Sequence, residues 1–374
     1  MTITYIIITL LYLFLIGRFV FGFDKVKIFR LEDVSPKTKF TVVIPFRNEA
    51  KNLPELLDSV LKLNYPKALF EIIFVDDESD DDSVEQIMRF LTSFPNDSKL
   101  INNIRVTNSP KKDAISTAIL HAKSDWIITT DADCVLPKYW LDGYDNFIQK
   151  NNATLIAGPV SYNNTNGFLN AFQTLDFLSL IGATIGGFGI NKPFLSNGAN
   201  MAYKKDFFIS VNGFEGNTNI ASGDDIFLLE KAIKQNPKEV HYLKCTHAIV
   251  STNPEPTVSK LIAQRVRWAS KTSYYTNSFA KAVGLLVLIA NAISIIGLVL
   301  TFLGLLKFKV FAYLFFIKIA IDFLLLYKTS QFFSKESVLK HYLWCGLLYP
   351  FFSVYIAFIS MFTSYKWKGR HFKK

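Results

Sequence analysis

Long apolar runs lie at both ends of the chain and frame a more polar middle. Residues 2–23 form a nearly unbroken apolar stretch of about the length that spans a bilayer, with Arg18 as its only charge. No basic segment precedes it and no small-residue cleavage site follows it, so it fits a membrane anchor better than a cleaved signal peptide. Basic residues follow at once, at Lys25, Lys27 and Arg30. By the positive-inside rule, the next segment, 24–278, is then expected in the cytoplasm.

Three further apolar runs occupy the C-terminal region, at about 282–306, 310–327 and 341–362. The first and third are typical of membrane spans. The middle run contains Lys318 and Asp322, four residues apart on one helical face where they can pair, so it is either a span or an interfacial element. The basic tail holds Lys366, Lys368, Arg370, Lys373 and Lys374. Three crossings would put this tail outside, whereas two keep it in the cytoplasm as the rule favours, so two or three C-terminal spans stay open.

Between these ends, short apolar runs alternate with segments of helical periodicity. Runs rich in β-branched residues predict strands at 40–45, 71–75, 104–106 and 126–130. Apolar residues at helical spacing predict helices at about 48–63, 84–91 and 113–122. This alternation favours a mostly parallel sheet with helices on both faces. Ligands bind at the carboxyl ends of such strands, so polar residues just after Pro45, Val75 and Thr130 are expected to converge.

One apolar stretch, 168–194, lies inside the polar middle. It is rich in glycine and interrupted by Asp176, which disfavours a membrane span. Two interpretations stay open: packing within the core, or an amphipathic element in the membrane interface. In the second interpretation, this stretch and the helix around 264–275 would admit a lipid head group from the bilayer.

Charge changes this picture mainly at the C-terminal end. The chain is half hydrophobic and carries a formal net charge of +10. Residues 279–374 hold 12 basic and 2 acidic side chains, so the whole excess lies in the most apolar region, as in membrane flanks. Residues 31–278 hold 25 basic and 28 acidic side chains, which disfavours a nucleic-acid-binding protein. The three cysteines, Cys134, Cys245 and Cys345, lack metal-ligand spacing; this favours free buried thiols in a reducing compartment and disfavours zinc.

Acidic residues follow two of the predicted strands. Six of the seven residues 76–82 are acidic, which indicates either a solvated loop or a site where Asp76 or Asp77 accepts hydrogen bonds from a base and a ribose. Asp131 and Asp133 follow the strand at 126–130. Carboxylates there suit Mg²⁺ or Mn²⁺, because these ions take few protein carboxylates and complete their shell with phosphate oxygens and water. Such a cation neutralises charge on a diphosphate leaving group.

Two further motifs carry candidate chemistry. Asp224 and Asp225 precede an apolar helical pattern, where they are either acids that the helix macrodipole favours or a general base for a hydroxyl. The sequence QRVRW ends at Trp268. It belongs either to an amphipathic helix with Arg265 and Arg267 facing lipid phosphate, or to a site where Arg267 contacts a diphosphate and Trp268 stacks on the second substrate.

In their order and spacing these motifs resemble family-2 glycosyltransferases, the processive and lipid-linked sugar transferases with a GT-A catalytic domain. The resemblance covers roughly residues 39–268 and the apolar segments around them. It rests on VVIPFRNEA at 42–50, VDDESDD at 75–81, KKDAI at 111–115, TDADC at 130–134, SNGANMAYKK at 196–205, VNGFEG at 211–216, SGDDIFLL at 222–229 and QRVRW at 264–268. Each motif is weak alone, whereas eight in order are specific. The chain departs from the family pattern at Asp224, where Glu is usual, and at Pro110, where Gly is usual before the family's Lys.

The resemblance implies roles for the matched residues. Those that would border the nucleotide base and ribose are Pro45, Arg47, Glu49, Asp76 and Asp77. Those that would approach the nucleotide or its phosphates are Lys111, Lys112 and Asp131. Asp131 and Asp133 match the metal–diphosphate motif, with Asp133 the more direct ligand of Mg²⁺ or Mn²⁺. Asp225, beside Asp224, matches the catalytic base, and the Q-x-x-R-W motif corresponds to Gln264, Arg267 and Trp268.

The resemblance also implies an architecture and an activity. The expected fold is α/β: a Rossmann-like GT-A domain with a mixed, mostly parallel sheet at 24–278, facing the cytoplasm. A transmembrane helix at 1–23 precedes it, and a C-terminal membrane domain with a basic tail at 279–374 follows it. The expected enzyme is a multi-pass protein of the inner or cell membrane that transfers a sugar, with inversion, from a nucleotide-diphosphate sugar to a lipid or lipid-linked acceptor. A UDP-sugar is preferred over a GDP-sugar.

Two alternatives to this activity remain. A processive polysaccharide synthase shares the motifs, although two or three spans after the catalytic domain are few for a secretion channel. A catalytically inactive scaffold on the same fold is the other alternative, which the intact set of Asp131, Asp133, Asp225 and Arg267 disfavours. The donor sugar, the acceptor and the oligomeric state are not readable from the sequence.

Overall fold

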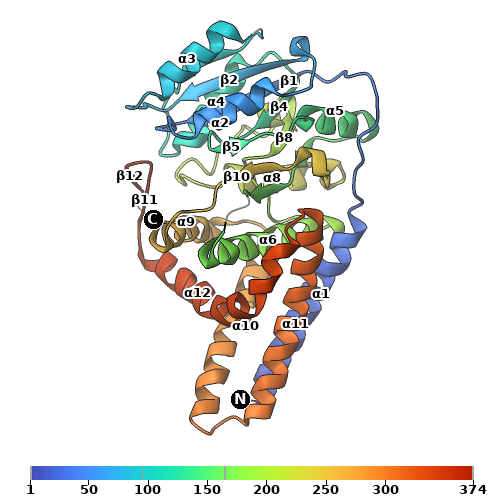
Figure 1. The fold of residues 1–374 in the computed structure, drawn as a ribbon, viewed down its shortest axis with the longest axis vertical. Helices are drawn as coiled ribbons and strands as arrows, with labels where there is room; N and C mark the ends of the chain where they lie inside the picture. Colours follow the sequence, from blue (N-terminus) through green and yellow to red (C-terminus); the bar gives the residue numbers. More distant parts are fainter. Residues whose placement is uncertain (1, 95, 164–165, 373–374) are drawn as a thin grey trace. The chain divides into compact units, whose positions relative to one another are not determined.

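The chain forms two compact units in a computed structural model that describes residues 2–94, 96–163 and 166–372 (Figure 1). The helical unit consists of Met1–Val26, Asn164–Phe194 and Pro254–Lys374, and the sheet unit of Lys27–Asn163 and Leu195–Asn253. The helical unit therefore includes two stretches, 164–194 and 254–278, that lie within the segment expected as the catalytic domain. Lys373 and Lys374 of the expected basic tail lie outside the described residues.

A mixed sheet of seven strands forms the centre of the described part of the sheet unit, in the order β3-β2-β1-β4-β8-β6-β9. The strands are β1 Phe40–Phe46, β2 Phe70–Asp76, β3 Lys99–Asn102, β4 Trp126–Thr129, β6 Leu155–Ala157, β8 Met201–Lys204 and β9 Val240–Tyr242. β1 to β4 run parallel, β8 is antiparallel to both of its neighbours, and β6 and β9 are parallel. A second sheet, β5-β10-β7, contains β5 Cys134–Val135, β7 Val160–Tyr162 and β10 Val250–Thr252. The sheet is therefore mostly parallel, as expected.

Apolar, β-branched sequence explains the central strands. β1 (FTVVIPF) and β2 (FEIIFVD) are buried at all but one position each, as expected for strands covered on both faces. The helices of the sheet unit are α2 Leu53–Leu61, α3 Ser83–Ser93, α4 Pro110–His121, α5 Trp140–Lys150, α7 Lys205–Ser210 and α8 Asp224–Gln235. The strands predicted at 40–45, 71–75 and 126–130 and the three predicted helices are present, with ends shifted by some residues.

The strand predicted at 104–106 is wrong. β3 ends at Asn102, and residues 104–107 form the loop that leads into α4. The backbone N–H of Ile104 donates to Thr117 Oγ1 at 3.2 Å, and those of Val106 and Thr107 donate to Asp113 Oδ2 at 3.1 and 2.9 Å. Side chains of α4 therefore take the hydrogen bonds that a neighbouring strand would otherwise supply.

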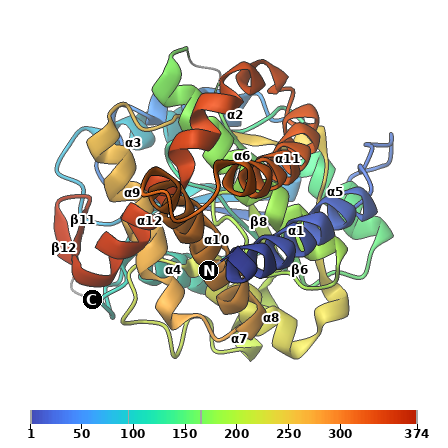
Figure 2. The same ribbon diagram turned by 90° about the horizontal axis from the view of Figure 1, so that it is seen from below.

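Five helices of the described helical unit are long and apolar enough, by length and composition, to cross a membrane. They are α1 Thr2–Lys25, α6 Phe168–Gly189, α10 Ser278–Phe302, α11 Phe308–Phe332 and the segment Glu336–Phe362, which contains α12 Tyr342–Phe362. The unit also contains α9 Val258–Ser270 and a hairpin of β11 Tyr365–Trp367 and β12 Arg370–Phe372. Within this unit, α1, α6 and α11 pack side by side (Figure 2).

Helix α6 is a packed core helix rather than an amphipathic surface element. Eight consecutive residues, 171–178, are buried, and a helix with one solvent-facing side exposes part of any such run. Its neighbours in the helical unit include α1 and α11. The core-packing interpretation of this stretch is therefore the one that the structure supports.

The two opposite charges in α11 form the ion pair that their spacing predicted. Lys318 Nζ lies 2.9 Å from Asp322 Oδ2, and the Tyr12 hydroxyl of α1 donates to Asp322 Oδ1 at 2.7 Å. The Lys318 ammonium also lies 5.2 Å from the centre of the Tyr12 ring. Because both charges are matched inside the unit, α11 keeps an apolar exterior despite carrying them.

Helices α1 and α6 approach each other closely because glycines face each other between them. A Cβ added to Gly22 would overlap the carbonyl oxygen of Gly186, and a Cβ added to Gly186 would lie 2.5 Å from the carbonyl oxygen of Phe19. Backbone atoms cannot move away from such a contact as a flexible side chain can. Gly17 of α1, by contrast, faces open space, with no atom within 4 Å of its added Cβ.

Replacing Gly22 by alanine is expected to separate α1 from α6 and to lower the free energy of unfolding by about 1–3 kcal/mol. Unfolding of the full chain in mixed detergent micelles, followed by far-ultraviolet circular dichroism, measures this loss. Gly17→Ala is the matched control in the same helix, and it should leave stability equal or slightly higher, since alanine favours helix. Equal stability of both variants would show that the glycine contact is not limiting.

Candidate active site

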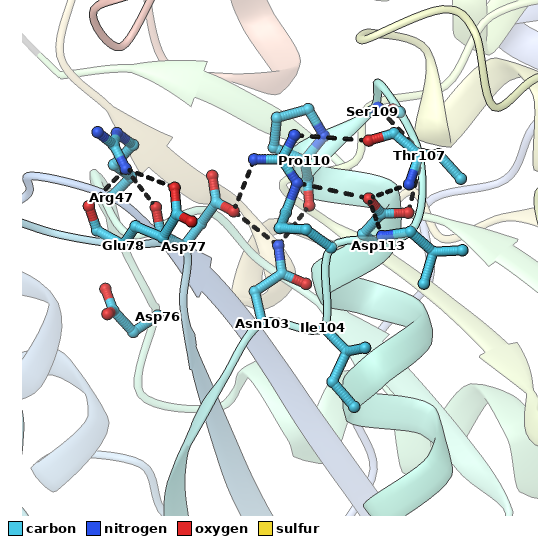
Figure 3. Close-up of polar contacts among 12 residues, drawn as sticks. Arg47, Asp76, Asp77, Glu78, Asn103, Ile104, Thr107, Ser109, Pro110 and Asp113 are labelled. Carbon is cyan, nitrogen blue, oxygen red and sulfur yellow. Dashed lines mark hydrogen bonds and ion pairs between the residues drawn. The ribbon is translucent and has the colours of Figure 1, made fainter.

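The loops that follow β1 and β2 are held together at the carboxyl edge of the sheet. Phe46 at the end of β1 is in register with Asp76 at the end of β2. Arg47, the next residue, donates from Nη1 to the carbonyl oxygen of Asp77 at 2.6 Å and to that of Glu78 (Figure 3). Within the acidic loop, the N–H of Ser79 donates to Asp76 Oδ1 at 3.0 Å. The acidic run is therefore ordered by specific contacts and is not simply a solvated loop.

The Asp77 carboxylate is buried and held by two residues of the β3–α4 connection (Figure 3). Asn103 Nδ2 donates to Asp77 Oδ1 at 2.7 Å, and Arg105 Nη1 lies 3.4 Å from the same oxygen. Arg105 Nε also lies 3.5 Å from Asp113 Oδ2. Asp113 in turn accepts the backbone hydrogen bonds of the loop that contains Arg105. Asp77, which the family resemblance placed at the nucleotide, is thus oriented by the loop before α4.

Two other residues expected near the base serve the start of α2 and β1. Asn52 Nδ2 donates to Glu49 Oε2 at 2.6 Å, and the N–H of Glu49 donates to Ser83 Oγ at 2.8 Å. Pro45 lies within β1, in register with Val75 of β2, and is partly exposed. Both therefore stand at the same strand ends as Arg47 and Asp77, and Glu49 contributes there to the local fold.

Three motifs far apart in sequence meet at Lys111, in the first turn of α4. Lys111 Nζ lies 2.6 Å from Asp131 Oδ1, just after β4, and 3.2 Å from Asp224 Oδ2, at the start of α8. The three side chains are only partly exposed, at 17% for Lys111, 36% for Asp131 and 11% for Asp224. Burial lowers the pKa of Lys111, but Asp131 and Asp224 outweigh it and hold the pKa above its usual range, so the group stays an ammonium.

Asp225 lies beside this cluster and is oriented by backbone groups. Its Oδ1 accepts from the N–H of Ile226 at 2.8 Å, and its Oδ2 accepts from the N–H of Gly198 at 3.3 Å. A Cβ added to Gly198 would lie 2.6 Å from Asp224 Oδ2, so only glycine fits there without displacement. Gly223, with φ of 89°, provides the left-handed turn that begins α8 and directs both aspartates to this place.

Lys112, which the resemblance placed near the nucleotide, is instead committed to the fold. Its side chain is buried, and Nζ donates to the carbonyl oxygens of Asn217 at 2.7 Å and Ile220 at 2.8 Å. The ammonium also lies 4.7 Å from the centre of the Phe227 ring of α8. The two adjacent lysines of α4 therefore have different partners: Lys111 pairs with carboxylates, and Lys112 binds the backbone of the loop before α8.

Few carboxylates are available to a metal ion, so they fit a cation whose remaining ligands are phosphate oxygens and water. Among the described residues, no group of three or more His, Cys, Asp or Glu side chains is placed to hold one ion. Asp131 is half-buried and Asp133 is exposed, and both carry the hard oxygen ligands that Mg²⁺ and Mn²⁺ prefer. Such an ion would take few protein ligands and depend on phosphate oxygens and water. The three cysteines are buried free thiols.

The QRVRW sequence lies on α9 in the helical unit and forms its own buried cluster. Arg265 Nε lies 2.6 Å from Asp176 Oδ2 of α6, with both side chains nearly buried, at 5% and 6% exposure. The Arg265 guanidinium lies 4.2 Å from the centre of the Trp268 ring, which also contacts Phe177 at 6.1 Å between ring centres. Arg265 therefore does not face lipid phosphate, as one interpretation of the sequence held, because it is paired inside the protein.

The remaining residues of this motif are half-buried on the same helix. Gln264 Nε2 donates to Glu255 Oε1 at 3.0 Å. The backbone of Glu255 is in turn held by Gln173 of α6, which donates to its carbonyl oxygen and accepts from its N–H, both at 2.9 Å. Arg267 and Trp268 are partly exposed. The motif thus contacts α6 in two ways: Gln264 through Glu255 to Gln173, and Arg265 directly to Asp176.

Several residues of these clusters carried no role in the sequence analysis. Asn103 precedes the segment wrongly predicted as a strand and Arg105 lies within it, so neither residue was assigned a role. Asp113 and Gly198 belong to the motifs KKDAI and SNGANMAYKK, which drew attention to the segments but not to these positions. Asp176 was visible as a lone acid in an apolar stretch, and a buried acid in such a place implies a partner. That signal could have predicted a basic partner.

Comparison with known proteins agrees with this fold. Residues 41–211 match the family model of glycosyl transferase family 2. The mannosyltransferase PcManGT from Pyrobaculum calidifontis, solved in complex with GDP-Man and Mn²⁺, has a similar fold at a TM-score of 0.55, with 16% identity and 96% of each chain covered. The mixed, mostly parallel sheet matches the GT-A fold. The similarity to glycosyl transferase family 2 therefore covers residues 41–211, a little less than half of the chain.

Two curated relatives are similar to part of the chain. Glycosyltransferase AglE of Haloferax volcanii is 24% identical over 227 residues, which cover 61% of this chain and 70% of that protein. Undecaprenyl-phosphate 4-deoxy-4-formamido-L-arabinose transferase of Salmonella choleraesuis is 36% identical over 107 residues, which cover 28% of this chain and 32% of that protein. The second match therefore spans about a third of its relative.

Proposed function

We propose that this protein is a membrane-bound, inverting glycosyltransferase that moves a sugar from a nucleoside-diphosphate sugar to a lipid or lipid-linked acceptor. The observation that carries the proposal is the convergence of Lys111, Asp131 and Asp224 beside Asp225. Glycosyl transfer from such a donor needs positive charge near the diphosphate and a base near the acceptor hydroxyl. Both kinds of group stand together in the sheet unit.

In this proposal Asp225 is the catalytic base. It takes the proton of the acceptor hydroxyl as that oxygen attacks the anomeric carbon, and the nucleoside diphosphate leaves. A single displacement inverts the anomeric configuration. The contacts of Asp225 with the N–H groups of Gly198 and Ile226 orient its carboxylate for this step, while Asp224 shares the charge of Lys111. In the helical unit, Arg267 is the proposed diphosphate contact and Gln264 and Trp268 the proposed acceptor contacts.

The donor site is proposed at the ends of β1, β2 and β4. Arg47 and Asp77, with Pro45, Glu49 and Asp76 around them, border the base and ribose, and Lys111 and Asp131 lie on the diphosphate side. Asp133 and Asp131 would hold Mg²⁺ or Mn²⁺, which when bound neutralises charge on the diphosphate. We prefer a UDP-sugar over a GDP-sugar on the family resemblance alone.

The membrane setting is proposed from the helices and the charge distribution. The five apolar helices support a multi-pass protein of the inner or cell membrane. The basic residues after α1 and in the C-terminal region favour a catalytic domain that faces the cytoplasm. A relative whose name includes undecaprenyl phosphate supports a lipid-linked substrate in the bilayer. No nucleic-acid partner is proposed.

A donor screen tests the proposal. Membranes containing the full chain, incubated with a panel of labelled UDP- and GDP-sugars and Mn²⁺ or Mg²⁺, are expected to give a lipid-extractable product with one donor. EDTA should remove the activity, since the proposed site depends on a divalent cation. Membranes without the protein are the control. A ladder of polymer lengths would favour a processive synthase, and no transfer from any donor would favour the inactive scaffold.

A further inference from the structure

The ammonium of Lys111 forms an ion pair with Asp131, the carboxylate at which the divalent cation is proposed to bind. Its Nζ contacts Asp131 Oδ1 at 2.6 Å and Asp224 Oδ2 at 3.2 Å, so one positive charge is shared by two negative ones. An added Cβ on Gly198 would lie 3.2 Å from Nζ, so the ammonium is enclosed on that side by backbone as well. This ion pair is partly buried and enclosed by backbone, unlike a chance pair of charges on the surface.

A dication and this ammonium cannot share Asp131 at low energetic cost. Two like charges a few ångströms apart in a partly buried place repel strongly, and one of them here would be doubly charged. The repulsion is relieved only if Lys111 leaves Asp131, or if further negative charge arrives with the cation. A diphosphate supplies that negative charge and also offers oxygens to both the cation and the ammonium.

We propose that Lys111 is an internal counter-ion that makes cation binding at Asp131 conditional on a diphosphate. In the ligand-free protein Lys111 neutralises Asp131 and keeps the affinity for a free divalent cation low. When a nucleoside diphosphate binds, its oxygens attract the ammonium away from Asp131 and complete the shell of the incoming cation. The inference rests on the proposed function for the identity of the cation site, but it concerns an equilibrium that can be measured without any sugar transfer.

The surroundings of Lys111 allow this exchange. The Asp131 side chain is 36% exposed and Asp133 next to it is exposed, so a cation and a phosphate group can reach the site from solvent. Lys111 has a flexible stem, and its second contact, Asp224, lies on the neighbouring helix α8. The adjacent Lys112 cannot take over the role, because its ammonium is bound to the carbonyl oxygens of Asn217 and Ile220.

The test is the affinity of the full chain in detergent for Mn²⁺, measured by electron paramagnetic resonance with and without UDP or GDP. The wild-type protein is expected to bind Mn²⁺ weakly alone and at least about tenfold more tightly with one of the nucleotides. Lys111→Met is expected to bind Mn²⁺ alone about tenfold more tightly than wild type, and to lose most of the nucleotide effect. Lys111→Gln provides a second neutral variant should the first fold poorly.

Matched variants separate this role from simple charge removal. Lys111→Arg keeps the charge and should behave as wild type, and Lys62→Met removes an exposed lysine paired with Asp58 and should change nothing. Asp131→Asn should abolish Mn²⁺ binding both in the wild-type protein and in the Lys111→Met variant. Equal affinity of wild type and both neutral variants for Mn²⁺ alone would overturn the role of Lys111. Failure of the wild type to bind Mn²⁺ even with nucleotide would instead overturn the cation site of the proposed function.

Discussion

Asp225→Asn is expected to lower the rate of sugar transfer by about 100- to 10,000-fold, the contribution that a general base typically makes. The amide keeps the size of the side chain, and its single oxygen can still accept from the N–H of Ile226 or from that of Gly198, so the fold and the donor site should persist. Nucleotide affinity should therefore stay within about threefold of wild type, since Asp225 is not placed at the base or ribose. Transfer to the acceptor and binding of UDP or GDP by titration calorimetry measure the two quantities.

Glu215→Gln is the matched control, because it removes one negative charge from the exposed loop before α8. That variant should retain wild-type transfer. Wild-type turnover by Asp225→Asn, with an intact fold, would contradict the role of Asp225. An equal loss in both variants would show that the charge of the region matters rather than the base.

Arg265→Met is expected to lower the free energy of unfolding by about 3–5 kcal/mol, because it leaves the Asp176 carboxylate buried without its ion-pair partner. Both side chains are nearly fully buried, and Arg265 also stacks on Trp268, so packing is lost as well as charge. Unfolding of the full chain in mixed detergent micelles gives the stability. Tryptophan emission gives a second measure, since Trp268 loses its neighbour.

A double variant separates the charge from the packing. Arg265→Met combined with Asp176→Leu removes both ions and should recover more than half of the loss, because an apolar pair of similar volume is often as stable as a buried ion pair. Lys260→Met, on the exposed side of the same helix, should change stability by less than about 0.5 kcal/mol. A double variant no more stable than Arg265→Met would rule out the buried charge as the cause.

Much of the sheet unit could be predicted because its signals are local. The strands β1, β2 and β4 are mainly apolar runs, and each is followed by a polar residue. The rule that parallel strands present ligands at their carboxyl ends then brought Asp77 and Asp131 to one edge without knowledge of the coordinates. The meeting of Lys111 with Asp131 follows from the same rule, since α4 comes after β3 and so begins at the carboxyl edge of the sheet.

Pairings between distant positions could not be predicted in this way. Arg265 and its partner Asp176 lie 89 positions apart, and Arg105 and Asp77 lie 28 apart. A single sequence gives no measure of such distances. The burial of α6 is likewise set by its neighbours, because Gly, Ser and Thr are spread around the helix and leave no apolar stripe. The misplaced strand at 104–106 has the same cause, since Asp113 and Thr117 compete for its backbone from α4.

The anchor that Lys112 makes has a consequence for how the sequence before α8 can vary. Lys112 holds the segment before α8 through the main-chain oxygens of Asn217 and Ile220, and every amino acid supplies such an oxygen. The side chains of this segment can therefore be exchanged while its path, and with it the position of Asp225, is retained. Exposed positions such as Glu215 and Asn219 are the ones open to substitution, whereas Phe214 is buried and Gly216 has a φ of 85°, so these two also fix the path of the segment.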